Sequence, residues 1–307
     1  MNYLVTCDSL KVQHMLCKNF DNYVKGHDFR DIFEQFGDGF VTADSETWKY
    51  IRNLLHSLIK QRRFEVFVHQ TVQKKVYTSL LPILDHAQQQ GRVVDLQDIL
   101  NRFTFDNICS TIVGHDPKEG MEEAPFDLLT ALITEERGRV HDDKFLRDAA
   151  FNLFAAGRET ITSVLTWFFW LIAKHPIVEA KIIEEIRDNL KTDEKKNNHG
   201  FLEDHRNHNL DQEQDLKKSV SGVVLGMEEV KKLVYLHGAL CEVMRLFPPV
   251  PIERKQAVKA DTLPSGHRVN GNTMIIFSPY AMGTNEEIWS VTLLRPYVPI
   301  DVDDNNE

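Results

Sequence analysis

Apolar residues recur every three or four positions along most of the chain that precedes Pro248, and this spacing places them on one face of an α-helix. The stretches with this pattern predict amphipathic helices over residues 47–67, 93–113, 177–190 and 228–247. Gly114 and Pro176 support two of these boundaries, because glycine often follows the end of a helix and proline is favoured in its first turn. We therefore expect this part of the chain to be largely helical.

One further segment, residues 143–174, predicts a longer helix. It contains no proline and a single glycine, and from Phe151 onward apolar residues occupy nearly every helical face. A helix that is apolar on all sides is normally buried. We therefore expect this helix to run through the middle of the fold and to end at His175.

The apolar pattern changes after the proline-rich run that follows the last helix. Residues 267–269 and 273–277 alternate as strands do, and Asn270-Gly271 between them is typical of a hairpin turn. The sequence thus predicts a mainly α protein with a small β portion near its C-terminus. Residues 191–221 predict a polar surface loop, and residues 290–307 predict a disordered tail.

The composition excludes several classes of protein. The 307 residues are 42% hydrophobic and 27% charged, as in an ordinary globular protein, and the net charge of −10 offers no basic surface for nucleic acid. The four cysteines are widely spaced without a C-x-x-C pair, so neither a zinc ribbon nor a disulfide framework is indicated. We find no apolar stretch of ~20 residues and no signal-peptide pattern, and expect no anchor within the chain.

Two pairs of residues offer candidate chemistry at helical spacing. Trp48 and Arg52 are four positions apart and lie on one helical face, where they could clamp a planar anionic ligand; the alternative is a half-buried tryptophan with the arginine stacked on it. Glu242 and Arg245 are three positions apart, a spacing that is common on helix surfaces and by itself says little.

A third group, Gly157, Glu159 and Thr160, lies inside the long apolar helix. Glycine costs about 1 kcal/mol relative to alanine in a helix interior, so its presence requires a reason. One reason is the close approach of a ligand, beside which Glu159 and Thr160 could relay protons, with the Thr160 hydroxyl bonded to a carbonyl one turn earlier. The alternative is a glycine at a tight helix crossing, with Glu159 in a salt bridge.

In this order and spacing, the three groups resemble the motifs of the cytochromes P450, which are haem-thiolate monooxygenases. Trp48 and Arg52 match the W-x-x-x-R of helix C in that family, residues 156–160 match the A-G-x-D/E-T of helix I, and Glu242 with Arg245 match the E-x-x-R of helix K. Other stretches resemble in particular the plant fatty-acid and alkane hydroxylases, namely residues 38–48, 232–242, 246–251 and 263–267.

The resemblance implies a cytochrome P450-like fold, a haem cofactor and a set of roles. Trp48 and Arg52 would contact a haem propionate, Glu159 and Thr160 would supply protons to the oxygen being activated, and Gly157 would leave room for it. The Glu242–Arg245 pair, named above, would be structural.

The implied reaction inserts one atom of O₂ into a C–H bond of a long-chain fatty acid or alkane, with electrons from an NADPH-dependent reductase. The cofactor would supply that chemistry. The family resides at the endoplasmic reticulum membrane, whereas a chain without an anchor would be cytosolic.

The chain also departs from the family pattern. The axial cysteine of the family lies in a loop reading roughly F-x-x-G-x-R-x-C-x-G, and none of Cys7, Cys17, Cys109 and Cys241 fits it, so we expect no metal ligand in this chain. Only about eight residues stand where the family has the helices that cover the substrate, between Pro117 and Pro125.

These departures suggest an incomplete domain. We expect a partial cytochrome P450 domain over residues 1–289, with an insertion at about 191–221 and an unrelated tail at 290–307, whose anchor segment would precede Met1. Its activity would be impaired. The main alternative is a non-catalytic helical remnant or interaction protein that binds no haem.

Two lesser alternatives involve histidine. One histidine could hold haem, although we expect His237 to be a packed structural residue. A divalent metal could bind in the polar loop to His199, Asp204, His205 and His208.

Overall fold

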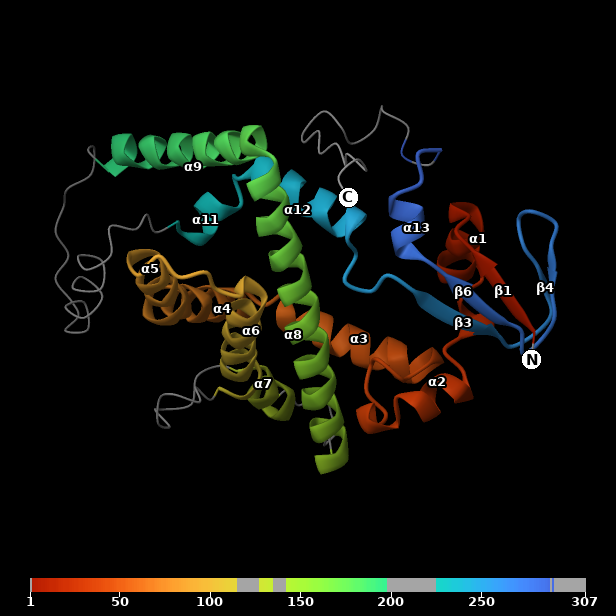
Figure 1. Ribbon diagram of the computed structural model, residues 1–307. Coiled ribbons are helices and arrows are strands. Elements are labelled where there is room, and N and C mark those ends of the chain that lie inside the picture. Colours follow the sequence, from red (N-terminus) through yellow and green to blue (C-terminus); the bar gives the residue numbers. More distant parts are fainter. Residues whose placement is uncertain (1, 115–126, 135–141, 198–224, 288, 290–307) are drawn as a thin grey trace.

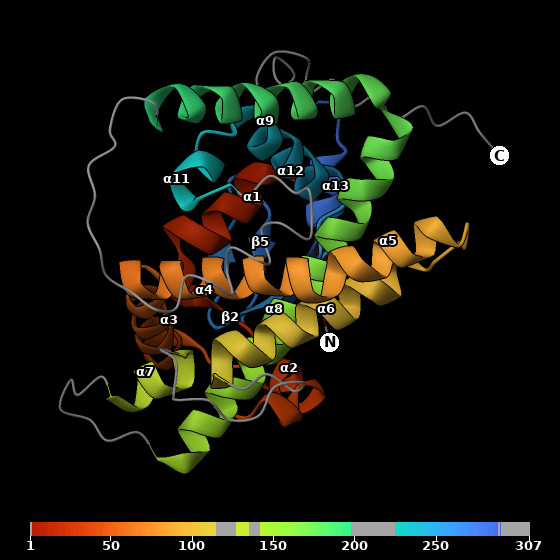
Figure 2. The same cartoon turned by 90° about the vertical axis from the view of Figure 1, so that its left-hand side faces the viewer.

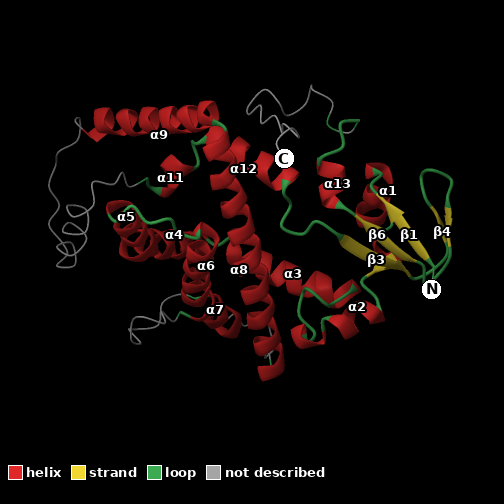
Figure 3. Ribbon diagram, viewed as in Figure 1, coloured by secondary structure: helices red, strands yellow, loops and turns green. Residues whose placement is uncertain are grey.

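The computed structural model of the protein describes residues 2–114, 127–134, 142–197, 225–287 and 289. As expected, this part is mainly helical, with a small β portion (Figures 1 and 3). The helices are α1 (Ser9–Gln13), η1 (His14–Lys18), η2 (Phe20–Asn22), α2 (His27–Ile32), η3 (Glu34–Phe36), α3 (Ser45–Ile59), α4 (Arg62–Lys75), η4 (Val76–Leu80), α5 (Leu81–Gln89), α6 (Leu96–Val113), α7 (Leu128–Thr134), α8 (Asp143–Lys174), α9 (Pro176–Asn197), α11 (Met227–Val230), α12 (Val234–Leu246) and α13 (Pro279–Gly283).

The long helix α8 has the expected boundaries and a central position. Asp142 caps its N-terminus by accepting a hydrogen bond from the backbone N–H of Phe145 at 2.8 Å. In Figure 1, α4, α5 and α6 lie on one side of α8 and the sheet lies on the other, and Figure 2 shows the three helices in front of the sheet. Its N-terminal half packs in one apolar cluster with α3 and α7, and its C-terminal half packs in another with α9 and α12.

The expectation that α8 is buried on all faces is wrong. Four large apolar side chains on α8 are 44–48% exposed: Phe151, Ile161, Phe169 and Trp170. The described neighbours of α8, namely α3, α6, α7, α9 and α12, leave part of its surface uncovered, so the all-apolar pattern does not correspond to full burial.

Two expected helices are each broken in two. The apolar period over 47–67 resumes beyond Lys60 and Gln61, but the chain turns there, because Gln61 has an extended backbone conformation between α3 and α4. The pattern over 228–247 is divided at Leu233, which is almost fully buried and has non-helical backbone angles, between α11 and α12.

Helix α9 continues beyond its expected end. We expected the helix to stop at residue 190 and the polar loop to begin there, but α9 extends to Asn197, since a polar sequence without glycine or proline can remain helical. The rest of the expected loop and the 290–307 tail lie outside the described residues, as do the four loop residues considered as metal ligands and the whole of the short 117–125 connection.

The β portion consists of two sheets. One has the order β1 (Tyr3–Thr6), β6 (Met274–Phe277), β3 (Glu253–Ala257) and β2 (Tyr23–Val24), in which β1 and β6 are parallel; the other pairs β4 (Asp261–Thr262) with β5 (Arg268–Val269). The expected hairpin at Asn270-Gly271 is therefore wrong: the turn exists, with Asn272 at φ 63°, but it connects strands of different sheets.

Two buried polar residues of α8 fix the loop that leads into α3. The Asp148 carboxylate accepts the backbone N–H of Asp38 at 3.0 Å, and Asn152 accepts the N–H of Val41 at 2.9 Å and donates to the Phe36 carbonyl at 2.8 Å. Hydrogen bonds from Asp38, Arg147 and Lys144 hold the pKa of Asp148 below its usual value, although burial acts to raise it. The loop before α3 is thus held against α8.

Candidate functional site

Trp48 and Arg52 lie together on one face of α3, as expected. The Arg52 guanidinium lies 5.2 Å from the centre of the Trp48 ring, and Trp48 is half-buried while Arg52 is exposed. The Phe20 ring also packs on Trp48, tilted by 38°, with ring centres 5.1 Å apart. The pair is thus a stacked tryptophan and arginine, whose guanidinium edge can still bind an anion.

Two lysines, Lys255 of β3 and Lys25 directly after β2, lie near Trp48. Lys255 lies 5.3 Å above the Phe20 ring, and it lines a small cavity together with Trp48 and Lys25. Burial lowers the pKa of Lys25 to about 8, with a further contribution from Lys255 and an opposing one from Asp44. The same effect, burial, lowers the pKa of Lys255. Positive charge is therefore concentrated here at a cost in solvation, which an anionic ligand would relieve.

Arg254 is a candidate that the sequence analysis did not include. Its Nε atom is buried and has no hydrogen-bond partner within the described residues, and its guanidinium lies 5.3 Å over the Phe29 ring. A buried N–H without an acceptor is costly, so this group indicates a missing ligand. The only sequence signal was its place shortly after the proline run at 248–251.

Thr160 makes the expected hydrogen bond within α8. Its Oγ1 donates to the Ala156 carbonyl at 2.5 Å, one turn earlier. Glu159 beside it is 68% exposed, and its carboxylate lies 3.6 Å from Nε of Arg158. The glutamate is thus solvated and accessible.

Gly157 faces the neighbouring helix α6. A Cβ atom at this position would lie 2.5 Å from Cδ1 of Ile108, closer than real Cβ contacts. Glycine therefore permits the close approach of α6 and α8, which is the alternative considered for this residue. A hydrogen bond between two buried hydroxyls also joins the two helices at this crossing, with Oγ1 of Thr104 and Oγ1 of Thr162 2.7 Å apart.

Glu242 and Arg245 form a buried, two-pronged ion pair on α12. Arg245 donates from Nε and Nη2 to the Glu242 carboxylate, at 3.1 and 2.7 Å, and the two side chains are only 16% and 8% exposed. Arg245 also donates from Nη1 to the Gly283 carbonyl, and the Trp289 ring covers it at 5.2 Å. The pair thus fastens α13 to α12, a structural arrangement.

The candidate residues lie on three helices, α3, α8 and α12. Because α8 shares one apolar cluster with α3 and the other with α12, it is the element that relates the three groups of candidate residues in space. The expected packing of His237 is wrong: its side chain is exposed, and its Nδ1 lies 3.8 Å from Sγ of Cys241.

Comparison with known proteins decides the family. The cytochrome P450 family model matches residues 2–125 and 117–291. The chain belongs to the cytochrome P450 family. Among curated cytochromes P450 and related proteins, it is 31% identical to alkane hydroxylase MAH1 of Arabidopsis thaliana, over 93% of this chain and 66% of the relative. It is 30% identical to noroxomaritidine synthase 2 of Narcissus aff. pseudonarcissus, over 94% of this chain and 66% of that relative.

The fold is also that of a cytochrome P450. A zebrafish cytochrome P450 solved with abiraterone matches with a TM-score of 0.69 at 18% identity, over 94% of this chain and 74% of the solved chain. The chain spans about two thirds of the length of the two curated relatives it matches. Within the described residues no single helix is long and apolar enough to cross a membrane, and α8 and α9 pass that test only as a pair bent by 108°.

Haem is the cofactor of the family, and part of the structure fits it. Trp48, Arg52 and Lys255 suit a carboxylate of haem, and the unpartnered Nε of Arg254 is a further donor on the other face of β3, since consecutive side chains of a strand alternate. The axial cysteine of the family lies in a loop. The four cysteines of this chain have settings different from that loop: Cys7 lies before α1, Cys17 in η1, Cys109 is buried in α6 and Cys241 is exposed on α12.

Proposed function

We propose that the protein is a haem-dependent monooxygenase-type oxidoreductase. The observation that carries this proposal is the Thr160 hydroxyl, held by the Ala156 carbonyl beside an exposed Glu159 on the central helix. When bound, haem activates O₂ for insertion of one oxygen atom into a C–H bond. The rest of the mechanism belongs to the residues of this chain.

Two groups of residues have separate tasks in this mechanism. Trp48, Arg52 and Arg254 bind the anionic edge of the cofactor and fix its orientation. Thr160 holds a proton at Oγ1, and Glu159, which reaches solvent, replaces that proton from water.

The proposed substrate is a long-chain fatty acid or alkane. A row of aromatic rings in tilted or edge-to-face contact leads from Arg254 to α8, with ring centres 4.5–5.7 Å apart: Phe29, Phe33, Phe36 and Phe151. These rings are partly exposed and offer a continuous apolar surface to an alkyl chain. The similarity to an alkane hydroxylase supports the same class.

Electrons would come from an NADPH-dependent reductase, and the site of action would be the endoplasmic reticulum membrane, as the family suggests. We also propose that the 307 residues form a partial domain with impaired activity, because each cysteine has a setting other than the axial loop. The Glu242–Arg245 pair would maintain the fold.

A second candidate function is that of a non-catalytic helical protein that binds no haem. The exposed apolar side chains of α8 favour it, since large exposed apolar surfaces often mark protein contacts.

The ferrous–CO absorbance spectrum of the chain, expressed with haem supplied, tests the proposal. A red-shifted Soret band of the thiolate type supports the monooxygenase and contradicts the impairment; single Cys→Ser variants then identify the ligand. A histidine-type band supports haem binding with impaired activity. Absence of bound haem contradicts the proposal and supports the non-catalytic alternative.

A further inference from the structure

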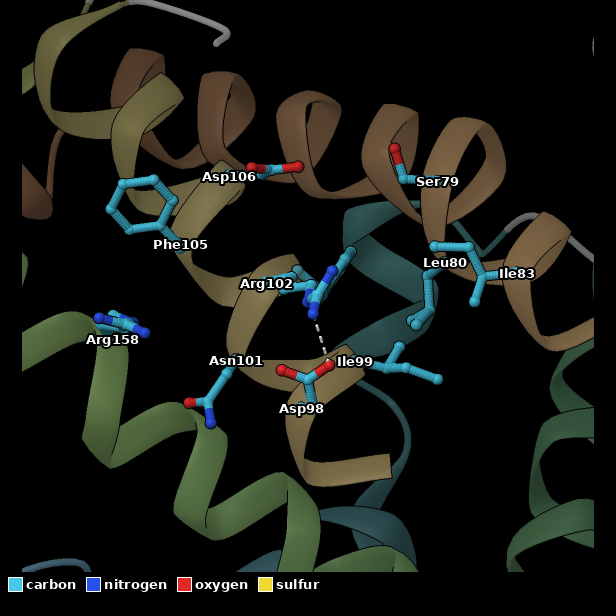
Figure 4. A pocket seen from close by; sticks show the side chains of 11 residues that line it. Ser79, Leu80, Ile83, Asp98, Ile99, Asn101, Arg102, Phe105, Asp106 and Arg158 are labelled. Atoms are coloured by element: carbon cyan, nitrogen blue, oxygen red, sulfur yellow. Dashed lines mark ion pairs between the residues drawn. The ribbon is translucent and has the colours of Figure 1, made fainter. Parts of the chain in front are cut away.

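Figure 4 shows a cavity of about 470 Å³ beside α6, in which the arginines are already paired. The Arg102 guanidinium lies 2.9 Å from the Asp98 carboxylate, and Nε of Arg158 lies 3.6 Å from Glu159. The Arg102–Asp98 pair separates the aliphatic side chains of η4 and α5 from Phe105 and Arg158 (Figure 4). The cavity therefore does not present a single ligand site.

The exposed face of α12, in contrast, carries two metal-ligating side chains in contact. His237 and Cys241 are four positions apart, and Nδ1 of His237 lies 3.8 Å from Sγ of Cys241. Both side chains are exposed, whereas Ala239, Val243 and Leu246 on the opposite face pack against α8 and α9. Two ligands at positions i and i+4 of a helix can bind one ion, as the two histidines of an H-E-x-x-H motif do.

The distance between the two ligand atoms fits a shared ion. With bonds of about 2.3 Å to sulfur and about 2.05 Å to nitrogen, a separation of 3.8 Å corresponds to an angle of about 120° at the metal. This is the angle of trigonal coordination, whereas a linear arrangement would need the two atoms about 4.35 Å apart. The pair can therefore hold a three-coordinate ion in its present conformation, with the third position open to a ligand from solvent.

The available ligands favour a soft monovalent ion. A thiolate with an imidazole suits Cu(I) better than it suits hard cations. Zinc sites normally have three or four protein ligands. Among the described residues no third histidine, cysteine or carboxylate lies close enough to join the pair, and Glu242 is held in its ion pair with Arg245. Met244 begins about 10 Å further along the helix than His237, too far to share the ion.

We propose that His237 and Cys241 form a Cu(I) site on the surface of α12. Binding displaces the thiol proton to solvent, and the charge of the thiolate cancels that of the ion. The site uses neither the cofactor residues Trp48 and Arg52 nor the proton-relay residue Thr160 of the proposed function. Its test is therefore independent of haem binding.

Competition with the chromophoric chelator bicinchoninate, in the absence of oxygen, measures Cu(I) binding to the full chain. Cys241→Ser and His237→Ala should each weaken the site at least about tenfold, because each removes one of two protein ligands. Cys17→Ser is the matched control and should leave the affinity unchanged. Cys17 is also exposed, but His14, the histidine nearest to it in sequence, is hydrogen-bonded to Asp261.

Two further measurements identify the ligands and the ion. X-ray absorption at the copper edge should show sulfur and nitrogen ligands, with the nitrogen lost in His237→Ala, while Met244→Leu on the same exposed face should change nothing. The affinity for Zn²⁺, measured by calorimetry, should be the same for the parent chain and Cys241→Ser. A lower Zn²⁺ affinity in that variant would overturn the assignment of the ion.

The four substituted side chains are exposed, so circular dichroism should show that all variants keep the fold. Haem-free and haem-loaded chains should bind Cu(I) equally, which separates failure of this proposal from failure of the proposed function. Equal losses in Cys17→Ser and Cys241→Ser would mean adventitious binding to any exposed thiol and would overturn the proposal. Unchanged affinity in His237→Ala would overturn it as well.

Discussion

The Glu185 carboxylate on α9 accepts a hydrogen bond from the backbone N–H of Tyr235 at 2.7 Å, although the residues are 50 positions apart. Its second oxygen accepts from the N–H of Leu236 at 2.9 Å. Helix α12 has no side-chain cap of its own, since Leu233 stands at its N-cap. Glu185 therefore caps α12 from another helix, and a carboxylate also suits the positive end of the helix dipole.

We expect Glu185→Ala to lower the free energy of unfolding by about 1–3 kcal/mol, because two N–H groups lose a charged acceptor. Glu184→Ala, at the exposed neighbouring position, should change it by less than about 0.5 kcal/mol. Urea unfolding followed by circular dichroism measures both. Equal effects of the two variants would refute the capping role.

The hydroxyls of Thr104 and Thr162 should be energetically coupled. Each hydroxyl has one proton, so one of the two donates to the other, and the acceptor donates to a carbonyl of its own helix. A single Thr→Val variant should therefore cost about 1 kcal/mol. In the double variant neither helix presents an unmatched hydroxyl, and the cost should fall short of the sum by at least about 0.5 kcal/mol. Thr111 provides the control, because in the contacts described here its hydroxyl forms hydrogen bonds only within α6. The Thr111→Val and Thr162→Val changes should therefore have additive effects on the free energy of unfolding.

Gly157 and Ile108 should behave as one packing unit. Gly157→Ala gains up to about 1 kcal/mol in helix propensity but pushes a Cβ into Cδ1 of Ile108. Ile108→Val removes that methyl group, so in the double variant the two changes should compensate by at least about 0.5 kcal/mol. Ile112→Val, one turn along α6, should be additive with Gly157→Ala. If Gly157→Ala is additive in unfolding free energy with both Ile108→Val and Ile112→Val, the α6–α8 crossing tolerates a side chain at residue 157.

Asp261 should make stability depend on pH in acid. Burial raises the pKa of its carboxyl, but hydrogen bonds from Tyr23, His14 and Asn19 outweigh this and lower it from 3.8 to about 2. The contribution, about 2 kcal/mol, is fully present above pH 3.8 and is lost as the pH falls through about 2. Asp261→Asn should flatten the stability profile in this window.

The control for this profile is Asp85→Asn, at an exposed position on α5. That variant should keep the acid dependence of the parent chain. Thermal unfolding measured at steps between pH 5 and pH 2 provides the comparison. The same slope in Asp261→Asn as in the parent would mean that another group is responsible.

Arg254 should contribute to haem affinity if the proposed function is right. Arg254→Met leaves the aliphatic stem but removes the buried Nε–H, and we expect about a tenfold loss of haem affinity in titrations followed at the Soret band. Arg268→Met on the exposed part of β5 should leave the affinity unchanged. Equal affinity of the two variants would remove Arg254 from the proposed site.

Local signals in the sequence predicted the elements better than their packing. The boundaries of α8 and the end of α6 at Gly114 follow from caps, glycine and proline, which act over a few residues. The break at Lys60 was missed because an apolar period can continue across a turn. The sequence did not reveal that the Asn270-Gly271 turn connects strands of different sheets, because a turn motif specifies a bend but not which strands pair.

In the candidate site, too, the contacts within one helix were predicted and the contacts between distant elements were not. The stacking of Trp48 with Arg52 and the bond from Thr160 to Ala156 follow from helical spacing, and both were expected. The contact of Gly157 with Ile108 and the unpartnered Nε of Arg254 depend on elements distant in sequence. A single sequence does not reveal such pairs, because no local period records them.

The parallel pairing of β1 with β6 has a consequence for synthesis. Tyr3 lies opposite Met274, so β1 leaves the ribosome long before its partner strand β6 has been synthesised. Until then β1 has an unpaired edge, which is a template for contact with other chains. Closure of the sheet therefore comes late in folding, and the edge of β1 needs protection from other chains until residue 277 has emerged.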